Sequence, residues 1–416
     1  MKQIIKFKIE ITIFILFFIT RFLFLQISEF NNFELQPDSY WYTKQSDEVL
    51  RGNFNLIKPL FITAPFFTYF QALIKFIFSS YWMGVLEILQ ISISSIAGIF
   101  FCKLSFQLFK KKQTAILSTI LFCFYPITLW WVGSFTQEIW FQSFLIIFFY
   151  YFMKSLDENS LKLLIVSAIF FSLTFLTKSH ILIFSIFIPI IILLKKNLLF
   201  FKKLKFIFAF IIISLVSTLP YGIYNLIVNK TYAISSSGSG GSFLVGNNEE
   251  AYLNFIKLDE ITPEQKKRFS HVMFTIFDEV KPKLKNKTQP EVQKIYFSEG
   301  LKWIKQNPAK AIELKINHAK SFFTPGISSY WHSYEKWLAA LIFSGPLYFF
   351  AYISIVYHLI SKFKENFWIL GLIISMFAFT IIFYYSGRFI VTTLEPYYII
   401  FASDLLVRTW NKFIRS

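Results

Sequence analysis

The sequence predicts an all-α polytopic membrane protein with about ten transmembrane helices, outer juxtamembrane helices and a small, mainly helical outer domain. The 416 residues are 55% hydrophobic and 21% aromatic, whereas soluble proteins have about 45–50% apolar residues even with glycine included. Several apolar runs reach the roughly 20 residues that cross a bilayer. Lysine and arginine cluster between these runs. The net charge of +18 is therefore attributed to basic loops that orient the spans among membrane lipids. Nucleic acid is not an expected partner.

The first 81 residues predict one span and a long outer segment. The N-terminal end carries three lysines among its first eight residues, and basic flanks stay in the cytoplasm. The first span covers about residues 11–27, and a polar loop follows to about residue 58. Residues 65–81 are apolar but include Lys75 and other polar groups. They are expected to lie along the membrane interface rather than cross it.

Nine more spans complete the predicted membrane region and leave both chain ends inside. The basic clusters at residues 110–112, 195–205 and 362–364, together with the basic tail, all fall on the inner side, as the positive-inside rule requires. The further spans are predicted over 82–109, 114–131, 138–153, 163–176, 181–194, 206–228, 337–360, 367–384 and 389–406.

A composition break at Asn229 divides the chain. Residues 1–228 form the predicted N-terminal transmembrane module, whose first outer loop, 28–81, is expected to be catalytic. Residues 229–335 are polar and mixed in charge, too long for a mere connector, and predict an outer domain with amphipathic helices near 263–279 and 291–306. Residues 336–416 supply the C-terminal transmembrane helices.

Ionisable side chains gather at predicted outer helix ends. Charges beside a bilayer cost several kcal/mol unless they are paired or wet, so they are functional candidates. Two alternatives stay open. Asp38 could cap a turn after Pro37, and long cations could extend to the headgroups, which is the favoured reading for Lys58. The residues concerned are Asp38, Lys58, Glu138, Lys178, His180 and Arg388.

This mixture of charges fits a sugar linked to a lipid phosphate. The cations suit a phosphate group, and the Asp38 carboxylate suits proton abstraction from a hydroxyl. The sequence has no nucleotide-binding glycine motif and no Cys/His cluster, so neither a nucleotide nor a zinc site is predicted. No cofactor is therefore expected, although a requirement for a divalent metal stays open.

Several short motifs occur in order along the chain. Together they resemble the GT-C fold glycosyltransferases that use polyprenyl phosphate, a group that includes protein O-mannosyltransferases and the aminoarabinose transferases of lipid A. The motifs are Asp38 with Tyr42 and Leu50-Arg51-Gly52, then Thr63-Ala64-Pro65, Ser134 to Glu138, Leu176-Thr177-Lys178, Pro220 to Asn225, Gly240 to Asn248, Trp303 to Pro308, and Gly387-Arg388-Phe389 with Pro396.

The resemblance implies roles for individual residues. It makes Asp38 the general base and places Lys178 and Arg388 at the carrier phosphate. It adds Asn247 and Asn248, with Tyr42 and Glu138, to the substrate pocket, and His180 and Lys58 are further candidates for the phosphate. The chain departs from the family pattern in three places: a basic residue and a proline are missing before Pro65, Tyr224 stands for an arginine, and Phe243 stands for an asparagine.

The resulting expectation is an inverting glycosyltransferase of a bacterial inner membrane. It moves one hexose or pentose from a polyprenyl-phosphate donor to a hydroxyl of a glycan, lipid or protein on the outer, periplasmic face. A lipid or sugar transporter or flippase is the main alternative, and it predicts broken helices in two related halves. A non-catalytic scaffold is the second. The third is a metal-dependent transferase of pyrophosphate-linked oligosaccharide, which would need further carboxylates near Asp38, such as Asp47 and Glu48.

Overall fold

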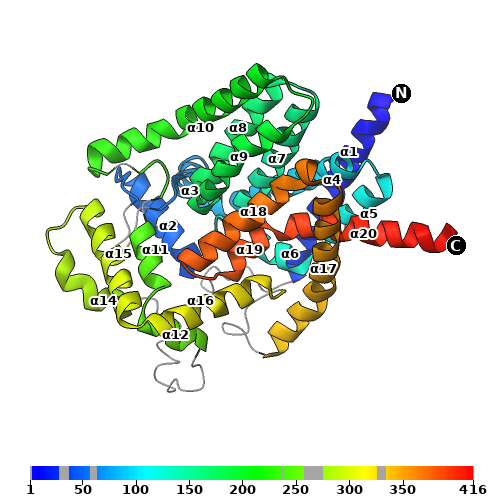
Figure 1. Cartoon of the computed structure of the whole chain (residues 1–416). Coiled ribbons are helices and arrows are strands. Elements are labelled where there is room, and N and C mark those ends of the chain that lie inside the picture. The colour runs from blue at the N-terminus through cyan, green and yellow to red at the C-terminus, as the bar shows by residue number, and fades with distance from the viewer. Residues whose placement is uncertain are drawn as a thin grey trace.

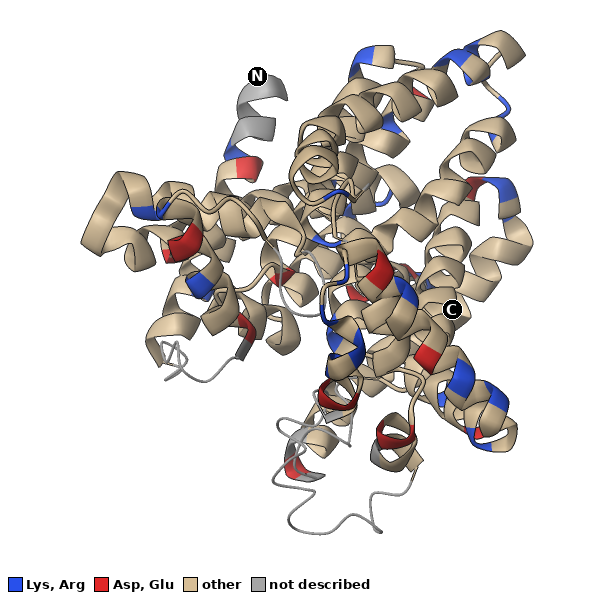
Figure 2. Ribbon diagram, turned by 90° about the vertical axis from the view of Figure 1, so that its left-hand side faces the viewer, with Lys and Arg blue, Asp and Glu red and all other residues tan. Residues whose placement is uncertain are grey.

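The computed structural model describes residues 2–27, 37–56, 63–231, 233–236, 238–256, 275–325 and 334–415. These parts of the chain are built from helices, without a strand, which confirms the all-α prediction. The two termini lie on the same side of the molecule, opposite the short helices of the outer region (Figure 1). Charged residues gather mainly toward the ends of the long helices (Figure 2), as expected where apolar stretches face lipid.

Apolar runs form the membrane helices of the N-terminal module. α7 is buried along most of its length and packs on α8 and α4, which makes it the centre of the module. Two shorter helices, α2 (Pro37–Leu50) and α3 (Pro65–Phe78), come before α4. The other helices are α1 (Lys2–Ile27), α4 (Trp82–Phe109), α5 (Lys112–Cys123), α6 (Pro126–Val132), α7 (Glu138–Asp157), α8 (Leu161–Thr177), α9 (Phe187–Leu194) and α10 (Phe200–Val228).

The predicted count of ten spans is not confirmed. Among the described residues, six helices are long and apolar enough to cross a membrane, or up to eight if each of two bent helix pairs is one span. The helices Leu161–Thr177 and Ser179–Leu194 are apolar but shorter. The C-terminal spans are α17 (Tyr334–Ser361), α18 (Phe363–Ile382) and the bent pair α19 (Gly387–Thr393) and α20 (Glu395–Arg415).

The expected interfacial helix is joined to the next span. α3 leads through a single 3₁₀ turn into α4, and the whole segment Pro65–Phe109 is one apolar stretch of 45 residues. A bilayer core needs only about 20 residues, so this segment is longer than a single crossing requires, and the interfacial position of α3 stays a prediction. The polar groups of α3 face protein: Thr68 and Gln71 are buried, and Lys75 donates to Asp47 of α2 at 2.6 Å.

The described residues of the outer region, where the sequence predicts a folded domain, form five α-helices. A capping box fixes the start of α15, because Thr288 and Glu291 exchange hydrogen bonds there and satisfy the free N–H groups of the first turn. Of the predicted amphipathic helix 263–279, the part before residue 275 lies outside the described residues. The helices are α11 (Ser239–Val245), α12 (Glu249–Ile256), α14 (Thr275–Val280), α15 (Gln289–Gln306) and α16 (Pro308–Phe323).

Gly246 joins the outer region to the membrane helices. A Cβ added there would overlap the Phe383 carbonyl, just after α18. We therefore expect Gly246→Ala to destabilise the protein by about 1–3 kcal/mol, the usual cost of overpacking, as measured by thermal unfolding in detergent. The control is Gly84→Ala, because Gly84 lies in α4 with open space around its Cβ position and should be neutral or slightly stabilising.

His318 predicts an acid-sensitive outer region. Burial, with the nearby charge of Lys315, lowers the pKa of His318 from 6.5 to about 3, so the folded state keeps it neutral where the unfolded chain protonates it. The free energy of unfolding should therefore be unaffected above pH 6.5 and fall, by at most about 1.4 kcal/mol per pH unit, as the pH drops from 6.5 toward 3. His318→Phe should flatten this slope in a denaturant titration, and an unchanged slope would contradict the assignment.

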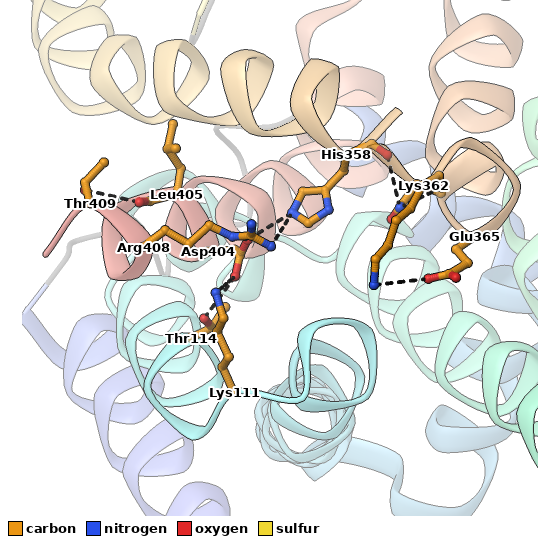
Figure 3. Close-up of polar contacts among 10 residues, drawn as sticks. Lys111, Thr114, His358, Lys362, Glu365, Asp404, Leu405, Arg408 and Thr409 are labelled. Carbon is orange, nitrogen blue, oxygen red and sulfur yellow. Dashed lines mark hydrogen bonds and ion pairs between the residues drawn. The ribbon is translucent and has the colours of Figure 1, made fainter. Parts of the chain in front are cut away.

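A buried acid holds the predicted inner ends of three helices together. Asp404 of α20 is fully buried and pairs with Lys111, before α5, at 3.1 Å and with His358 of α17 at 2.9 Å. Arg408, one turn further along α20, contacts the same carboxylate, and Figure 3 shows Lys111, His358 and Arg408 around it. Basic segments expected on one face of the membrane thus meet at one end of the molecule. This cluster of Asp404, Lys111, His358 and Arg408 is called the Asp404 cluster below.

Candidate active site

Asp38 lies in the first turn of α2, directly after Pro37. Proline is favoured at the first helical position, and a carboxylate near a helix N-terminus is stabilised by the helix dipole. Local preference therefore explains why an aspartate stands here. The side chain is 39% exposed, so it is neither in bulk solvent nor enclosed by apolar neighbours.

Arg388 is the partner of Asp38, although 350 residues separate them. It is the second residue of α19, and its Nη1 donates to Oδ2 of Asp38. The same nitrogen lies 3.6 Å from Oε1 of Glu138. The Arg388 side chain is 35% exposed, so this guanidinium links a half-exposed carboxylate to a buried one.

Glu138 and Lys178 form the buried half of the site. Glu138 opens α7, and Lys178 is the residue that ends α8. The Lys178 Nζ lies 2.7 Å from Oε1 of Glu138, and the two side chains are 2% and 1% exposed. The Nζ also lies 4.8 Å from the ring centre of Phe389. Breaking a buried pair of this kind is strongly unfavourable, so the ends of α7 and α8 are held together.

The four charges form an alternating row, Asp38, Arg388, Glu138 and Lys178. It runs from the half-exposed rim into the interior, and its two negative and two positive charges cancel. Neutrality makes a charged row tolerable at membrane depth. Such a row can accept a proton at its exposed carboxylate and hold an anion at its cations. We call it the charge row below.

Comparison with known proteins bears on this arrangement. Residues 62–224 match the family model described as dolichyl-phosphate-mannose-protein mannosyltransferase. That segment holds Glu138 and Lys178 but leaves out Asp38 and Arg388. No curated protein matches the chain.

Solved structures extend the comparison to nearly the whole chain. It is similar to the oligosaccharyltransferase AglB from Archaeoglobus fulgidus in complex with an inhibitory peptide and a dolichol-phosphate, with a TM-score of 0.54 and 16% identity. It is also similar to an A. fulgidus oligosaccharyltransferase tethered with an acceptor peptide, with a TM-score of 0.56 and 13% identity. Each match covers 97% of this chain and 50% of the other, so the chain spans about half the length of these structures.

The chain shares its helical fold with the AglB oligosaccharyltransferase. The helical match with AglB covers almost all of this chain, and the mannosyltransferase model covers the segment from α3 to α10. The resemblance inferred from the motifs is thereby confirmed at the level of fold. The two ends of the charge row, Asp38 and Lys178, come from the first turn of α2 and from the residue that follows α8.

Two further predicted residues lie close to the charge row. Tyr42 is buried, packs edge-on against Phe67, and interacts electrostatically with Asp38 and Glu138. Burial raises the pKa of Tyr42 well above its ordinary value, so its hydroxyl stays protonated. His180 is also buried, and its Nε2 lies 3.3 Å from the hydroxyl of Thr393 at the end of α19. The described contacts of His180 thus attach α19 to the segment after α8.

Asn247 and Asn248, which are predicted for the substrate pocket, make hydrogen bonds to backbone carbonyls. The Asn247 amide donates to the carbonyls of Phe243 and Ile382, and the Asn248 amide donates to that of Leu244. Both side chains are buried. Their described bonds hold the turn between α11 and α12 and attach it to the end of α18. Lys58, the remaining predicted phosphate contact, lies outside the described residues.

Tyr384 is a neighbour that the sequence analysis did not single out. It lies between α18 and α19 and interacts electrostatically with Arg388, Asp38 and Glu138. A phenol beside a charge row can donate to a bound anion or orient a carboxylate. The sequence feature that could have identified Tyr384 is its position in an aromatic stretch, four residues before Arg388.

The state of the carboxylates in the charge row bears on whether a divalent metal could bind there. Hard cations such as Mg²⁺ need several oxygen ligands free to converge on them. Here both carboxylates of the charge row are already paired with protein cations, and the described part of the chain has no group of three or more His, Cys, Asp or Glu able to hold a metal ion.

Proposed function

We propose that this chain is an inverting glycosyltransferase that moves a single sugar from a polyprenyl phosphate to an acceptor hydroxyl at the outer face of a bacterial inner membrane. The observation that carries the proposal is the pairing of Asp38 with Arg388 next to the buried pair of Glu138 and Lys178. One exposed base and two cations at the end of apolar helices match a substrate with an apolar tail, a phosphate and a sugar.

The reaction is a single displacement. The acceptor oxygen forms a bond to the anomeric carbon while its proton passes to the Asp38 carboxylate, and the bond from that carbon to the phosphate oxygen breaks. The lipid phosphate leaves as an anion with the bonding electrons. Arg388 and Lys178 stabilise the developing charge. Glu138 keeps both cations in place, since its Oε1 lies 2.7 Å from Lys178 and 3.6 Å from Arg388.

Donor binding also changes the state of Asp38 in this mechanism. Arg388 donates directly to Asp38 in the structure, and a carboxylate paired with a guanidinium is a weak base. An incoming phosphodiester adds one negative charge and competes for the same guanidinium. Asp38 then loses part of its partner and becomes more basic when a donor is in place.

The outer face is supported by the position of the two clusters. The Asp404 cluster gathers basic segments that the positive-inside rule assigns to the cytoplasm, at the end where α20 finishes. The charge row lies at the starts of α2, α7 and α19. Each of these starts is predicted to lie on the outer side.

A transporter or flippase for lipid-linked sugars is the second candidate. The pairs α5–α6 and α19–α20 are bent by 53° and 55° at short breaks, and broken helices occur at transporter binding sites. Such sites lie near the bilayer midplane, whereas the charge row lies at helix ends. This difference favours transfer over transport.

A reconstituted assay distinguishes the two. Purified protein in liposomes is given a radiolabelled polyprenyl-phosphate sugar and a mixture of envelope glycans, lipids and peptides. Transferase activity predicts label in an acceptor and free polyprenyl phosphate in equal amounts. Movement of intact donor across the bilayer, without release of polyprenyl phosphate, would overturn the proposal and support transport.

A further inference from the structure

Two broken helices of this fold share the same local design. α5 and α6 are bent by 53° at Phe124 and Tyr125, just before Pro126. α19 and α20 are bent by 55° at Leu394, just before the Glu395-Pro396 step. Proline lacks an N–H donor and disfavours helical backbone in the preceding residue. The sequence thus fixes where each helix breaks.

The residues before the two prolines meet inside the protein. The Tyr348 hydroxyl of α17 donates to Oε1 of Glu395 at 2.8 Å. The Tyr125 hydroxyl lies beside the same carboxylate and shares a hydrogen bond of 2.9 Å with Ser344 of α17. Glu395 and Tyr348 are both 1% exposed. We call Glu395, Tyr348, Tyr125 and Ser344 the Glu395 cluster.

A buried carboxylate inside a membrane protein is costly and marks a functional candidate. Nothing in the proposed reaction uses Glu395 directly. However, α19 has only seven residues, and Arg388 stands at its other end. Thr393, the last residue of α19, lies two residues before Glu395, and its hydroxyl contacts His180. The direction in which α19 leaves the break therefore sets where the Arg388 guanidinium lies.

We propose that Glu395 is a positioning residue: by bonding Tyr348 and Tyr125 at the break, it fixes the angle between α19 and α20 and thereby holds Arg388 against Asp38 and the donor phosphate. The part of this inference that concerns the donor phosphate rests on the proposed function. Its structural part, the fixed orientation of α19, stands on the contacts of the Glu395 cluster alone.

The Asp404 cluster offers a matched control. It also centres on a buried acid of α20 and also joins α20 to α17 and to the α5 region. It lies nine residues further along α20, away from the break. Asp404→Asn should therefore weaken the same helix contacts without turning α19.

The test compares four variants of the whole chain in liposomes: Glu395→Ala, Glu395→Gln, Tyr348→Phe and Asp404→Asn. Glu395→Ala is expected to raise the KM for the polyprenyl-phosphate sugar about tenfold, the effect of one hydrogen bond to a charged group, while the KM for the acceptor stays unchanged. Glu395→Gln keeps an acceptor oxygen and should restore most of the loss. Tyr348→Phe should resemble the alanine variant. Asp404→Asn should lower the Tm and leave the donor KM unchanged.

Hydrogen exchange measures the orientation of α19 independently of catalysis. In Glu395→Ala, the amides of residues 387–393 should exchange faster than in the wild type, and in Asp404→Asn they should not. An unchanged exchange rate in Glu395→Ala, or an equal change of donor KM in Asp404→Asn, would overturn the inference. If the wild type transfers no sugar, the proposed function is wrong. The hydrogen-exchange result would still decide whether Glu395 fixes the orientation of α19.

Discussion

Replacing Asp38 by asparagine is expected to reduce sugar transfer by about 10²–10⁴-fold, the usual contribution of a general base. Asparagine keeps the size of the side chain and an oxygen that can accept from Arg388, so the contact between α2 and α19 survives in part. It has no site that can take the proton of the acceptor hydroxyl. The rate is measured as label transferred per minute in liposomes, with thermal unfolding to show that the fold is retained.

The same helix supplies the control for this experiment. Asp47 of α2 pairs with Lys75 of α3 at 2.6 Å and is 45% exposed. Asp47→Asn should change transfer by no more than about twofold, because Asp47 lies outside the charge row. It should lower the Tm, because Lys75, whose side chain is 6% exposed, loses its carboxylate partner. Transfer by Asp38→Asn at the level of the Asp47 variant would remove Asp38 from the reaction. A selective loss in Asp47→Asn would make that residue the better candidate.

Much of the fold was accessible from the sequence, because lipid imposes simple rules on apolar runs and basic flanks. The helices α1, α4, α7, α10, α17 and α18 follow runs that hydropathy alone detects. The breaks were harder to predict. Pro126 and Pro396 were visible, but the residues that satisfy each interruption, such as Tyr348 for Glu395, come from a distant helix and leave no local pattern.

The candidate site divides in the same way. Depth along the membrane placed Asp38, Glu138, Lys178 and Arg388 at one level, and the structure brings these four together. Depth does not determine which cation meets which carboxylate, because that depends on packing between helices. Asn247 and Asn248 were singled out by a family motif, and their pocket role stays a prediction. The structure adds that their amides are bonded to nearby backbone carbonyls, as capping asparagines often are.

The buried pair of Glu138 and Lys178 predicts the largest loss of stability in the site. Glu138→Gln leaves the Lys178 ammonium, 2% exposed, without its carboxylate, and an uncompensated buried charge costs about 3–5 kcal/mol. Lys178→Gln should cost less, because Glu138 keeps a second cation in Arg388 at 3.6 Å. Thermal unfolding of both variants in the same detergent gives the order.

The double variant Glu138→Gln with Lys178→Gln separates stability from catalysis. It removes both charges at once, so much of the lost stability should return, and the double-mutant cycle should show strong coupling between the two positions. Transfer should stay low, because one of the two cations that stabilise the leaving phosphate is gone. Additive losses of stability would show that the pair is not coupled, and normal transfer by the double variant would limit the phosphate site to Arg388.

The charge row therefore has to meet two separate requirements. Neutrality keeps it folded in the membrane, and its cations make it reactive toward a lipid phosphate.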